Sequence, residues 1–278
     1  MKNISYYIKR LCEEKQPLRF ILSRLLCGLY PLSYFIVIDR GSYKIRFFPT
    51  ALSTSLWYQP ADRLEEEVLL ESILECGSVF IDVGANIGTH SLAAASLVGA
   101  RGRIVAFEAS PRTCKFLRKN IELNGFENIE VINSAVGDRD GNLLFSDFTQ
   151  DDVNRPSIDG GGNEVEIVRL DSIIDEKNIR LLKIDVEGFE PAVFQGGLNT
   201  LAIVEVVIFE ANPTRMQDYG FAFEHLRSLL LGKGFLLYRG SGDKFLKIED
   251  NYTPEEGEDM LAVREDFFKA LSSKLDFI

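Results

Sequence analysis

From residue 79 onward the chain alternates between short apolar runs and longer amphipathic segments, and this alternation constrains the fold more than any other feature. The amphipathic segments lie near residues 88–98, 111–123, 188–196 and 218–231. Runs of Val, Ile and Leu that alternate with helices are typical of a parallel sheet covered on both faces. We therefore expect a doubly wound, mostly parallel α/β sheet with the strands VFIDV (79–83), RIVAFE (103–108), IEVINSAV (129–136), IRLLKID (179–185), VEVVIFE (204–210) and FLLY (235–238).

Other segments depart from this alternation. NLLF and EVEIV flank the glycine-rich DGGGN and predict a β-hairpin inserted before the fourth strand, within residues 143–168. Near the end of the chain, EDMLAVRED predicts an edge strand, and near its beginning LSYFIVIDRGSYKIRFF predicts a hairpin around an Arg-Gly-Ser turn. We expect a small helix and hairpin extension in residues 1–60 and one main domain in residues 61–278, which opens with the helix DRLEEEVLLESILE.

Net charge limits the kinds of binding partner that the chain can have, and cysteine content indicates the redox state of its cellular compartment. The net charge of -11 disfavours nucleic acid, because binding to phosphates requires clustered Lys and Arg. The cysteines contain no CxxC pair, which indicates neither a zinc site nor a disulfide framework. A reducing, cytoplasmic location fits this usage best, and the cysteines concerned are Cys12, Cys27, Cys76 and Cys114.

Residues 18–38 form the most apolar stretch of the N-terminal part. Arg19, Arg24 and Pro31 interrupt it before it reaches the roughly 20 apolar residues of a membrane-spanning helix. A signal peptide is also disfavoured, because Glu13 precedes the apolar part and no small-residue cleavage site follows. The simplest interpretation is an amphipathic helix that packs on the main domain, and a peripheral membrane contact is the alternative.

The glycine turn in VFIDVGANIGTHS follows the first predicted strand of the main domain. A dinucleotide turn needs a second glycine two residues after the first, but Gly84 is followed by Ala85 and Asn86. No Gly-Lys-Ser or Gly-Lys-Thr follows, which excludes a P-loop, and Asp82 would repel a pyrophosphate. The turn therefore favours a ligand without phosphates.

A second carboxylate follows the next strand. Glu108 can accept hydrogen bonds from both hydroxyls of a ribose, at the sheet edge where open α/β folds bind ligands. A ribose at one end and an aminoacyl chain near an acid at the other describe S-adenosylmethionine.

These segments resemble the FkbM-type family of S-adenosylmethionine-dependent methyltransferases. The matching pieces cover about residues 78–212, and LKIDVEGFE is far more specific than the glycine turn alone. The resemblance implies a class I methyltransferase fold (Rossmann-like, with an inserted β-hairpin) that methylates oxygen, often on a sugar or polyketide hydroxyl. The pieces are FIDVGANIGTHSLAAA, VAFEASPRTCKFLRKNIELNG, VINSAVGDRDGNLLF, VRLDSIID, LLKIDVEGFEPAVFQGG and VVIFEAN.

The resemblance also implies a set of cofactor residues. The turn would line the methionine and ribose, Glu108 would hold the ribose, and the segment after the third strand would lie near adenine. One of Glu65 to Glu67 would approach the cofactor from the preceding helix. The residues implied for cofactor binding are Asp82, Gly84, Ala85, Asn86, Gly88, Glu108, Ala109, Ser134, Ala135 and Asp185.

Methyl transfer to an alcohol needs alignment and a general base. The candidates for the base are Asp185 and Glu187, with Glu210 and His90 behind them. In a continuing strand Asp185 and Glu187 would point the same way, and could meet one substrate or a divalent cation. Alternatively, one would bind cofactor or backbone amides and the other would cap the following helix. Lys183 could pair with either acid, and we assign no metal ligand.

The leading hypothesis is therefore an S-adenosylmethionine-dependent O-methyltransferase that acts on a hydroxyl of a sugar or glycoconjugate, with a small molecule or glycan as its acceptor. The alternatives are a non-catalytic module that binds S-adenosylmethionine or a partner, and methylation of nitrogen or of a carboxylate. Trp57 and Tyr58 could form a wall for the substrate or simply pack, and His225 is interpreted as an ordinary surface or core histidine.

Overall fold

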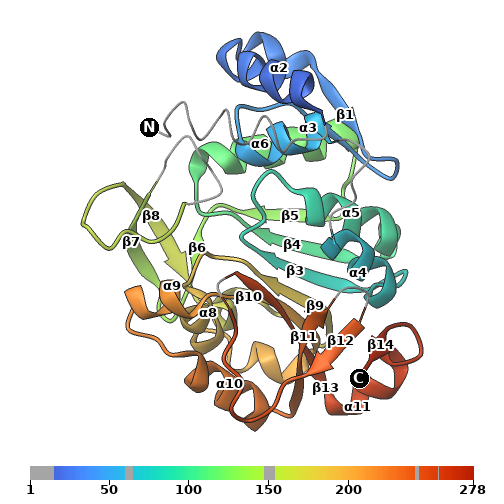
Figure 1. The fold of residues 1–278 in the computed structure, drawn as a ribbon, viewed down its shortest axis with the longest axis vertical. Coiled ribbons are helices and arrows are strands. Elements are labelled where there is room, and N and C mark those ends of the chain that lie inside the picture. The colour runs from blue at the N-terminus through green and yellow to red at the C-terminus, as the bar shows by residue number, and fades with distance from the viewer. Residues whose placement is uncertain (1–15, 60–64, 147–153, 242–243, 256) are drawn as a thin grey trace.

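The computed structural model describes residues 16–59, 65–146, 154–241, 244–255 and 257–278. Its main sheet is built, within these residues, from β3 (Val79–Val83), β4 (Arg103–Phe107), β5 (Ile129–Ile132), β9 (Ile179–Ile184), β10 (Val204–Ala211), β11 (Phe235–Ser241), β12 (Lys244–Lys247), β13 (Glu258–Arg264) and β14 (Asp276–Phe277). The strand order is β14-β12-β11-β13-β10-β9-β3-β4-β5 (Figure 1). Neighbours from β5 through β10 pair in parallel, which confirms the mostly parallel sheet.

Helices cover both faces of this sheet, as expected for a doubly wound fold. On β3, Phe80 points into one apolar cluster and Ile81 into another, because successive side chains of a strand alternate. The first cluster includes residues of α4 (Glu65–Ile73), α5 (Thr89–Val98) and α6 (Pro111–Asn124). The second includes residues of α8 (Glu190–Gln195), α9 (Pro213–Asp218) and α10 (Phe223–Gly232), with the short α7 (Leu170–Ile173) beside them.

Two predicted strands differ from the structure. The segment 129–136 is not one strand, because the chain leaves the main sheet after Ile132 and forms β6 (Ala135–Val136) in a separate sheet. EDMLAVRED is not an edge strand either. It forms β13, which pairs antiparallel with both β10 and β11, and its residues 260–263 are all buried. The edge on that side is β14.

The inserted hairpin is confirmed. β7 (Gly141–Phe145) and β8 (Asn163–Val168) pair antiparallel, and β6 adds in parallel to β8 to make a three-stranded sheet. This small sheet stands beside the carboxyl end of β5, so the insertion reaches the edge where a ligand of the main sheet would bind (Figure 1).

The N-terminal part forms α2 (Pro17–Gly28), a short 3-10 turn (Leu32–Phe35), the hairpin β1 (Val37–Asp39) and β2 (Lys44–Arg46), and α3 (Ala51–Tyr58). The hairpin closes around residues 40–43, as predicted. Phe47 and Phe48 lie in the same apolar cluster as Phe80, so this part shares a core with the main sheet. A domain boundary near residue 60 stays a prediction.

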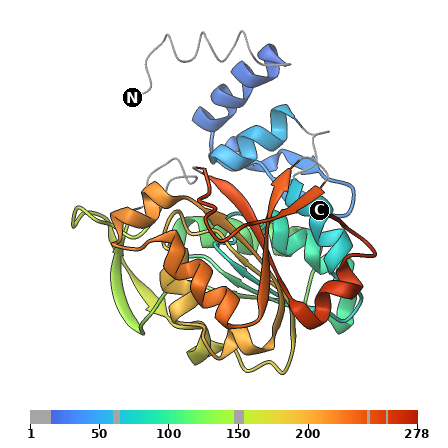
Figure 2. The same ribbon diagram turned by 60° about the horizontal axis from the view of Figure 1, so that its bottom comes forward.

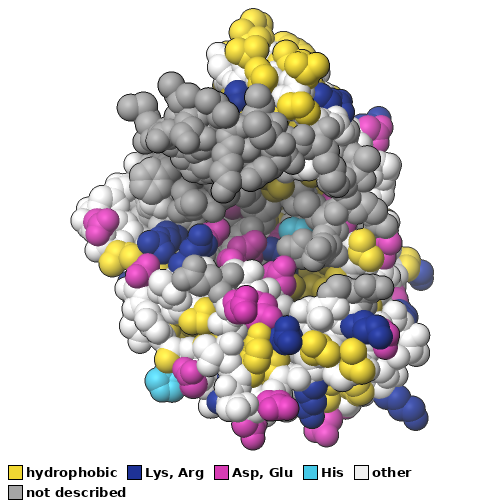
Figure 3. All heavy atoms as spheres, viewed as in Figure 1, with side chains coloured by type: hydrophobic (Ala, Val, Ile, Leu, Met, Phe, Trp, Pro, Cys, Tyr) yellow, Lys and Arg dark blue, Asp and Glu magenta, His cyan; other side chains and the backbone are white. Residues whose placement is uncertain are grey.

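The outermost of these elements is α2, which lies beyond α3 in Figures 1 and 2. Apolar side chains gather at this end of the molecule (Figure 3). Within the part of the chain that the structure describes, no helix is both long and apolar enough to cross a membrane. After β13 the chain forms α11 (Glu265–Leu271), which packs against β13, and it then ends in β14.

Candidate functional site

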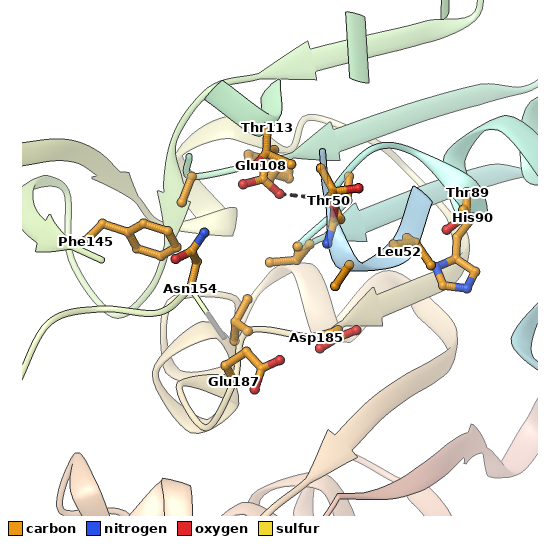
Figure 4. A pocket seen from close by; sticks show the side chains of 18 of the residues that line it. Thr50, Leu52, Thr89, His90, Glu108, Thr113, Phe145, Asn154, Asp185 and Glu187 are labelled. Carbon is orange, nitrogen blue, oxygen red and sulfur yellow. Dashed lines mark hydrogen bonds between the residues drawn. The ribbon is translucent and has the colours of Figure 1, made fainter. Parts of the chain in front are cut away.

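A cavity of about 780 Å³ opens at the carboxyl ends of β3, β4 and β9. Val83, Phe107 and Lys183 bring the strand ends to it, and the opposite wall comes from the N-terminal part. Figure 4 shows Glu108, His90, Asp185 and Glu187 arranged around this space. The N-terminal wall consists of Arg24, Cys27, Gly28, Pro49, Thr50, Ala51, Leu52, Thr54, Ser55 and Tyr58.

The glycine turn between β3 and α5 forms the floor of the cavity. Gly84 has a φ of 87°, and a Cβ there would overlap the carbonyl oxygen of Asp185, so this position requires glycine. Asn86 also lies in the left-handed region, with a φ of 51°. Gly88 caps α5 with a φ of 96°. The two glycines allow the left-handed backbone of the turn, and Gly84 also allows the turn to lie against the end of β9. Of the predicted turn residues, all except Asp82 and Gly88 line the cavity.

Asp82 lies beneath the turn. Its side chain is fully buried, and Oδ2 accepts a hydrogen bond of 2.6 Å from the Ser91 hydroxyl on α5. It is not among the residues that line the cavity. The geometry therefore gives Asp82 a role in fixing α5 to β3, and direct contact with a ligand stays a prediction.

Glu108 follows β4 and lines the cavity while only 8% exposed. Its Oε2 accepts from the Asn86 backbone N–H at 2.9 Å, and its Oε1 accepts from the Ser110 backbone N–H at 2.8 Å. The carboxylate thus links the glycine turn to the start of α6. Each oxygen retains capacity for another donor.

The segment after β5 contributes backbone to the same cavity. Ser134 and Ala135 line it, and Ala109 lies beside them. The Ser134 hydroxyl donates to Glu166 on β8 at 2.7 Å, so the inserted hairpin holds this segment in place.

Carboxylates gather at the other end. The candidate ligand atoms of Asp185, Glu187 and Glu210 lie within 4.8 Å of one another. The Lys183 ammonium pairs with Asp185 at 3.0 Å, and Arg215 on α9 pairs with Glu187. Burial, followed by the negative charges of Asp185 and Asp259, raises the pKa of Glu210 to about 7, although Lys183 opposes this shift.

Asp185 and Glu187 converge for a different reason from the predicted one. β9 ends at Ile184, so the two acids do not share the face of a continuing strand. Glu187 instead adopts the left-handed conformation, with a φ of 61°. This backbone turn aims its carboxylate into the cavity that Asp185 also lines (Figure 4).

Glu190 is a fully buried acid beside the site that the sequence analysis did not single out. Its Oε1 accepts from the backbone N–H groups of Val186 and Gly188, at 3.1 and 3.2 Å. These bonds hold the loop before α8, and the N-cap position of α8 itself, Phe189, makes no side-chain capping bond. Burial raises the pKa of Glu190 to about 8. The available signal was an acid two residues after the glycine in VEGFE, where a side chain can reach back to the amides of the turn.

The remaining candidates divide clearly. His90 and Tyr58 line the cavity, whereas Trp57 and the exposed His225 do not. Glu67 is buried away from the cavity and pairs with Arg40 at 3.0 Å. The side chains of Glu65 and Glu66 lie outside the described residues, as does Cys12.

The cavity fits an adenosyl sulfonium. Its volume lies within the roughly 300–1,000 Å³ range of small-molecule pockets. At one end Glu108 can accept from neighbouring hydroxyls, and at the other Asp185 and Glu187 supply negative charge that attracts a cation. No pyrophosphate would be favoured between these carboxylates.

A family model and several known proteins are similar to this chain. The family model described as Methyltransferase FkbM domain matches residues 82–237. Hexuronic acid methyltransferase AglP of Haloferax volcanii is 26% identical over 182 residues, which is 63% of this chain and 73% of that protein. The protein named Probable cobalt-precorrin-6B C(15)-methyltransferase (decarboxylating), of Sulfolobus acidocaldarius, is 38% identical over 56 residues; these cover 20% of this chain and only 29% of that protein's length. The solved structure of Methyltransferase FkbM from Methylobacillus flagellatus aligns with a TM-score of 0.47 and 14% identity over 88% of this chain and 59% of that one.

Proposed function

The chain belongs to the FkbM methyltransferase family, and on this premise we propose that it transfers a methyl group from S-adenosylmethionine to a hydroxyl of a sugar or glycoconjugate. One observation carries the proposal: the glycine turn and Glu108 line the same cavity as Asp185 and Glu187. The residues proposed to hold the cofactor and those proposed to meet the acceptor would then share one cavity. The name of the AglP relative, a hexuronic acid methyltransferase, supports a sugar acceptor.

The cofactor end is assigned by hydrogen-bonding capacity. Glu108 would accept from the ribose hydroxyls while its bonds to Asn86 and Ser110 keep it oriented. Ser134 and Ala135 would offer backbone groups to adenine. When bound, S-adenosylmethionine supplies a methyl group attached to a positively charged sulfur. The carboxylates near the other end would attract that charge.

At the acceptor end, Asp185 would remove the hydroxyl proton. It is the cavity carboxylate with the more exposed side chain, 43% against 18% for Glu187. Lys183 holds it in position from a site that is itself buried. Glu187 would orient the acceptor by accepting a hydrogen bond. The Glu210 carboxylate lies within 4.8 Å of Asp185 and Glu187. Its pKa of about 7 suits it to take up, near neutral pH, the proton that Asp185 removes from the acceptor.

Calorimetry with S-adenosylmethionine and with NAD tests the first step, and binding of NAD alone would overturn the proposal. Transfer of labelled methyl to free hexuronic acids and hexuronate oligosaccharides tests the second. Asp185→Asn should lower kcat by about 10²–10⁴-fold, because a general base acts in the transfer step. It should weaken the affinity for S-adenosylmethionine far less, because Glu187 still supplies negative charge to the sulfonium. The exposed Asp250→Asn is the matched control.

Equal losses of kcat and of cofactor affinity in Asp185→Asn would make Asp185 a cofactor ligand instead of the base. Labelling that survives only on amine or carboxylate acceptors would replace the hydroxyl with those groups. A divalent cation at Asp185, Glu187 and Glu210 would show as loss of activity with a chelator. A cytoplasmic location stays a prediction from cysteine usage.

A further inference from the structure

The outer face of α2 is apolar. Its exposed side chains are spaced three to four residues apart, which places them on one side of a helix. The opposite side is buried: Phe20 packs edge-on against Tyr58 of α3 at 5.5 Å, and Ser23 is inaccessible. A surface helix normally turns polar residues to water, whereas α2 exposes apolar side chains on its outer side as well as packing them on its inner side. The exposed residues are Leu18 (76%), Ile21 (44%), Leu22 (49%), Leu25 (60%) and Leu29 (53%).

The apolar surface continues beyond the helix. Leu32 and Phe35 are 71% and 77% exposed, and Tyr30 and Val37 are each 41% exposed. These four residues, Leu29 and the four exposed apolar residues of the helix are called the α2 face, and part of it is the apolar cap in Figure 3. The other exposed large apolar residues of the described chain are scattered, one each on α4, β7, α7 and α10 and the rest outside helices and strands. A concentrated patch of this kind marks an interaction surface.

Charge identifies the kind of partner. Residues 16–50 contain five Lys and Arg against one Asp, and of these five only Arg40 is buried in an ion pair, with Glu67. Arg19 and Arg24 flank the apolar stripe, and their guanidinium groups lie 5.2 Å from the ring centres of Trp57 and Phe20, respectively. Leu and aromatic residues bordered by arginine are typical of helices that lie in the interface of an anionic membrane.

We propose that the α2 face docks on an anionic lipid bilayer, with α2 parallel to the membrane plane. Its 12 residues extend only about 18 Å, so the helix can lie in the interface but cannot span the roughly 30 Å hydrocarbon core. A second copy of the chain is a poorer partner, since a symmetric contact through this face would bring Arg19 and Arg24 of one copy near the same arginines of the other. Because Arg24, Cys27 and Gly28 also line the cavity, docking brings the cavity close to the lipid headgroups.

Sedimentation of the full chain with sucrose-loaded vesicles tests this inference. Vesicles of phosphatidylcholine mixed with phosphatidylglycerol should bind the protein, and vesicles of phosphatidylcholine alone should bind it more weakly. The variant Leu18→Ser/Leu22→Ser/Leu25→Ser should lose roughly tenfold in affinity per leucine. Arg19→Gln/Arg24→Gln should remove most of the preference for phosphatidylglycerol.

The matched control is Leu144→Ser/Leu198→Ser/Leu231→Ser, which changes exposed leucines elsewhere in the chain and should bind as the native chain does. Thermal unfolding of each variant shows that the chains are folded. The proposal is overturned if both serine variants bind equally well, or if the native chain does not bind mixed vesicles. The α2 face would instead be assigned to a second copy if the native chain formed dimers but did not bind vesicles, and if Leu18→Ser/Leu22→Ser/Leu25→Ser abolished the dimers. Vesicle binding needs no methyl transfer, so this test is independent of the proposed function.

Discussion

Glu190 is the buried acid that holds the loop between Asp185 and Gly188. One of its oxygens accepts the two loop amides, and the other has no hydrogen-bond partner among the described residues. Burial favours the uncharged form, and this raises its pKa to about 8. The folded chain therefore retains a proton that the unfolded chain releases near its usual pKa of 4.5.

This difference makes stability depend on pH. Between about pH 5 and 8 the folded state binds more protons than the unfolded state, so the free energy of unfolding falls as pH rises. Glu190→Gln keeps an oxygen for the loop amides and cannot ionise. Urea unfolding across this range should show a flatter pH dependence, with a relative gain on the order of 1–3 kcal/mol at the alkaline end. The exposed Glu249→Gln should leave the slope unchanged, and an unchanged slope in Glu190→Gln would contradict the buried proton.

At the scale of elements, a buried ion pair joins the N-terminal hairpin to α4. Arg40 pairs with Glu67 at 3.0 Å, the two side chains are 3% and 7% exposed, and the Tyr43 hydroxyl also donates to Glu67. Arg40→Met should destabilise the chain by about 3–5 kcal/mol in urea unfolding, because it leaves a buried carboxylate without its cation. Arg40→Met/Glu67→Met should recover most of this loss.

The exposed pair of Lys119 and Glu122 provides the comparison, since Lys119→Met should lower the free energy of unfolding by less than about 1 kcal/mol. A double variant as unstable as the single one would contradict this account.

The alternation of apolar and amphipathic segments predicted most of these elements, because a strand buried on both faces requires a continuous apolar run. It did not predict where IEVINSAV divides. The Asn133 amide donates to the carbonyls of Glu108 and Ala109, at 2.8 and 3.2 Å, and the chain changes sheets at that point. The interior position of β13 was also missed, since strand order depends on contacts between segments far apart in the sequence.

The site, like the fold, was predictable where it depends on strand ends and not where it depends on packing between distant segments. Glu108 and Asp185 were candidates because they follow buried strands, where ligands of such sheets bind, and both line the cavity. The direction of Glu187 was not predictable, because it depends on a left-handed backbone that only the packed loop imposes. Glu67 was ambiguous for a similar reason: three successive acids look alike until Arg40 and Tyr43 reach one of them.

At the scale of the whole molecule, the N-terminal part connects the cavity to the α2 face. Residues 24–58 close the cavity that the strand ends open, and the outer surface of the same N-terminal part carries the apolar stripe. If that surface rests on a bilayer, an acceptor anchored in the same bilayer is confined near the cavity. Confinement raises the effective concentration of the acceptor without any new contact in the site.

The serine variant of Leu18, Leu22 and Leu25 should therefore separate two kinds of acceptor. None of these leucines lines the cavity, so methylation of a soluble hexuronate oligosaccharide should keep its kcat/KM. The same glycan on a lipid tail, in vesicles that contain phosphatidylglycerol, should lose about 10²-fold in kcat/KM, because the variant no longer shares the surface with its acceptor. The Leu144, Leu198 and Leu231 variant should process both acceptors as the native chain does. Equal losses on the soluble and the anchored glycan would mean that α2 acts through the cavity wall. Equal retention on both would mean that docking does not deliver the acceptor, even where vesicle binding itself is established.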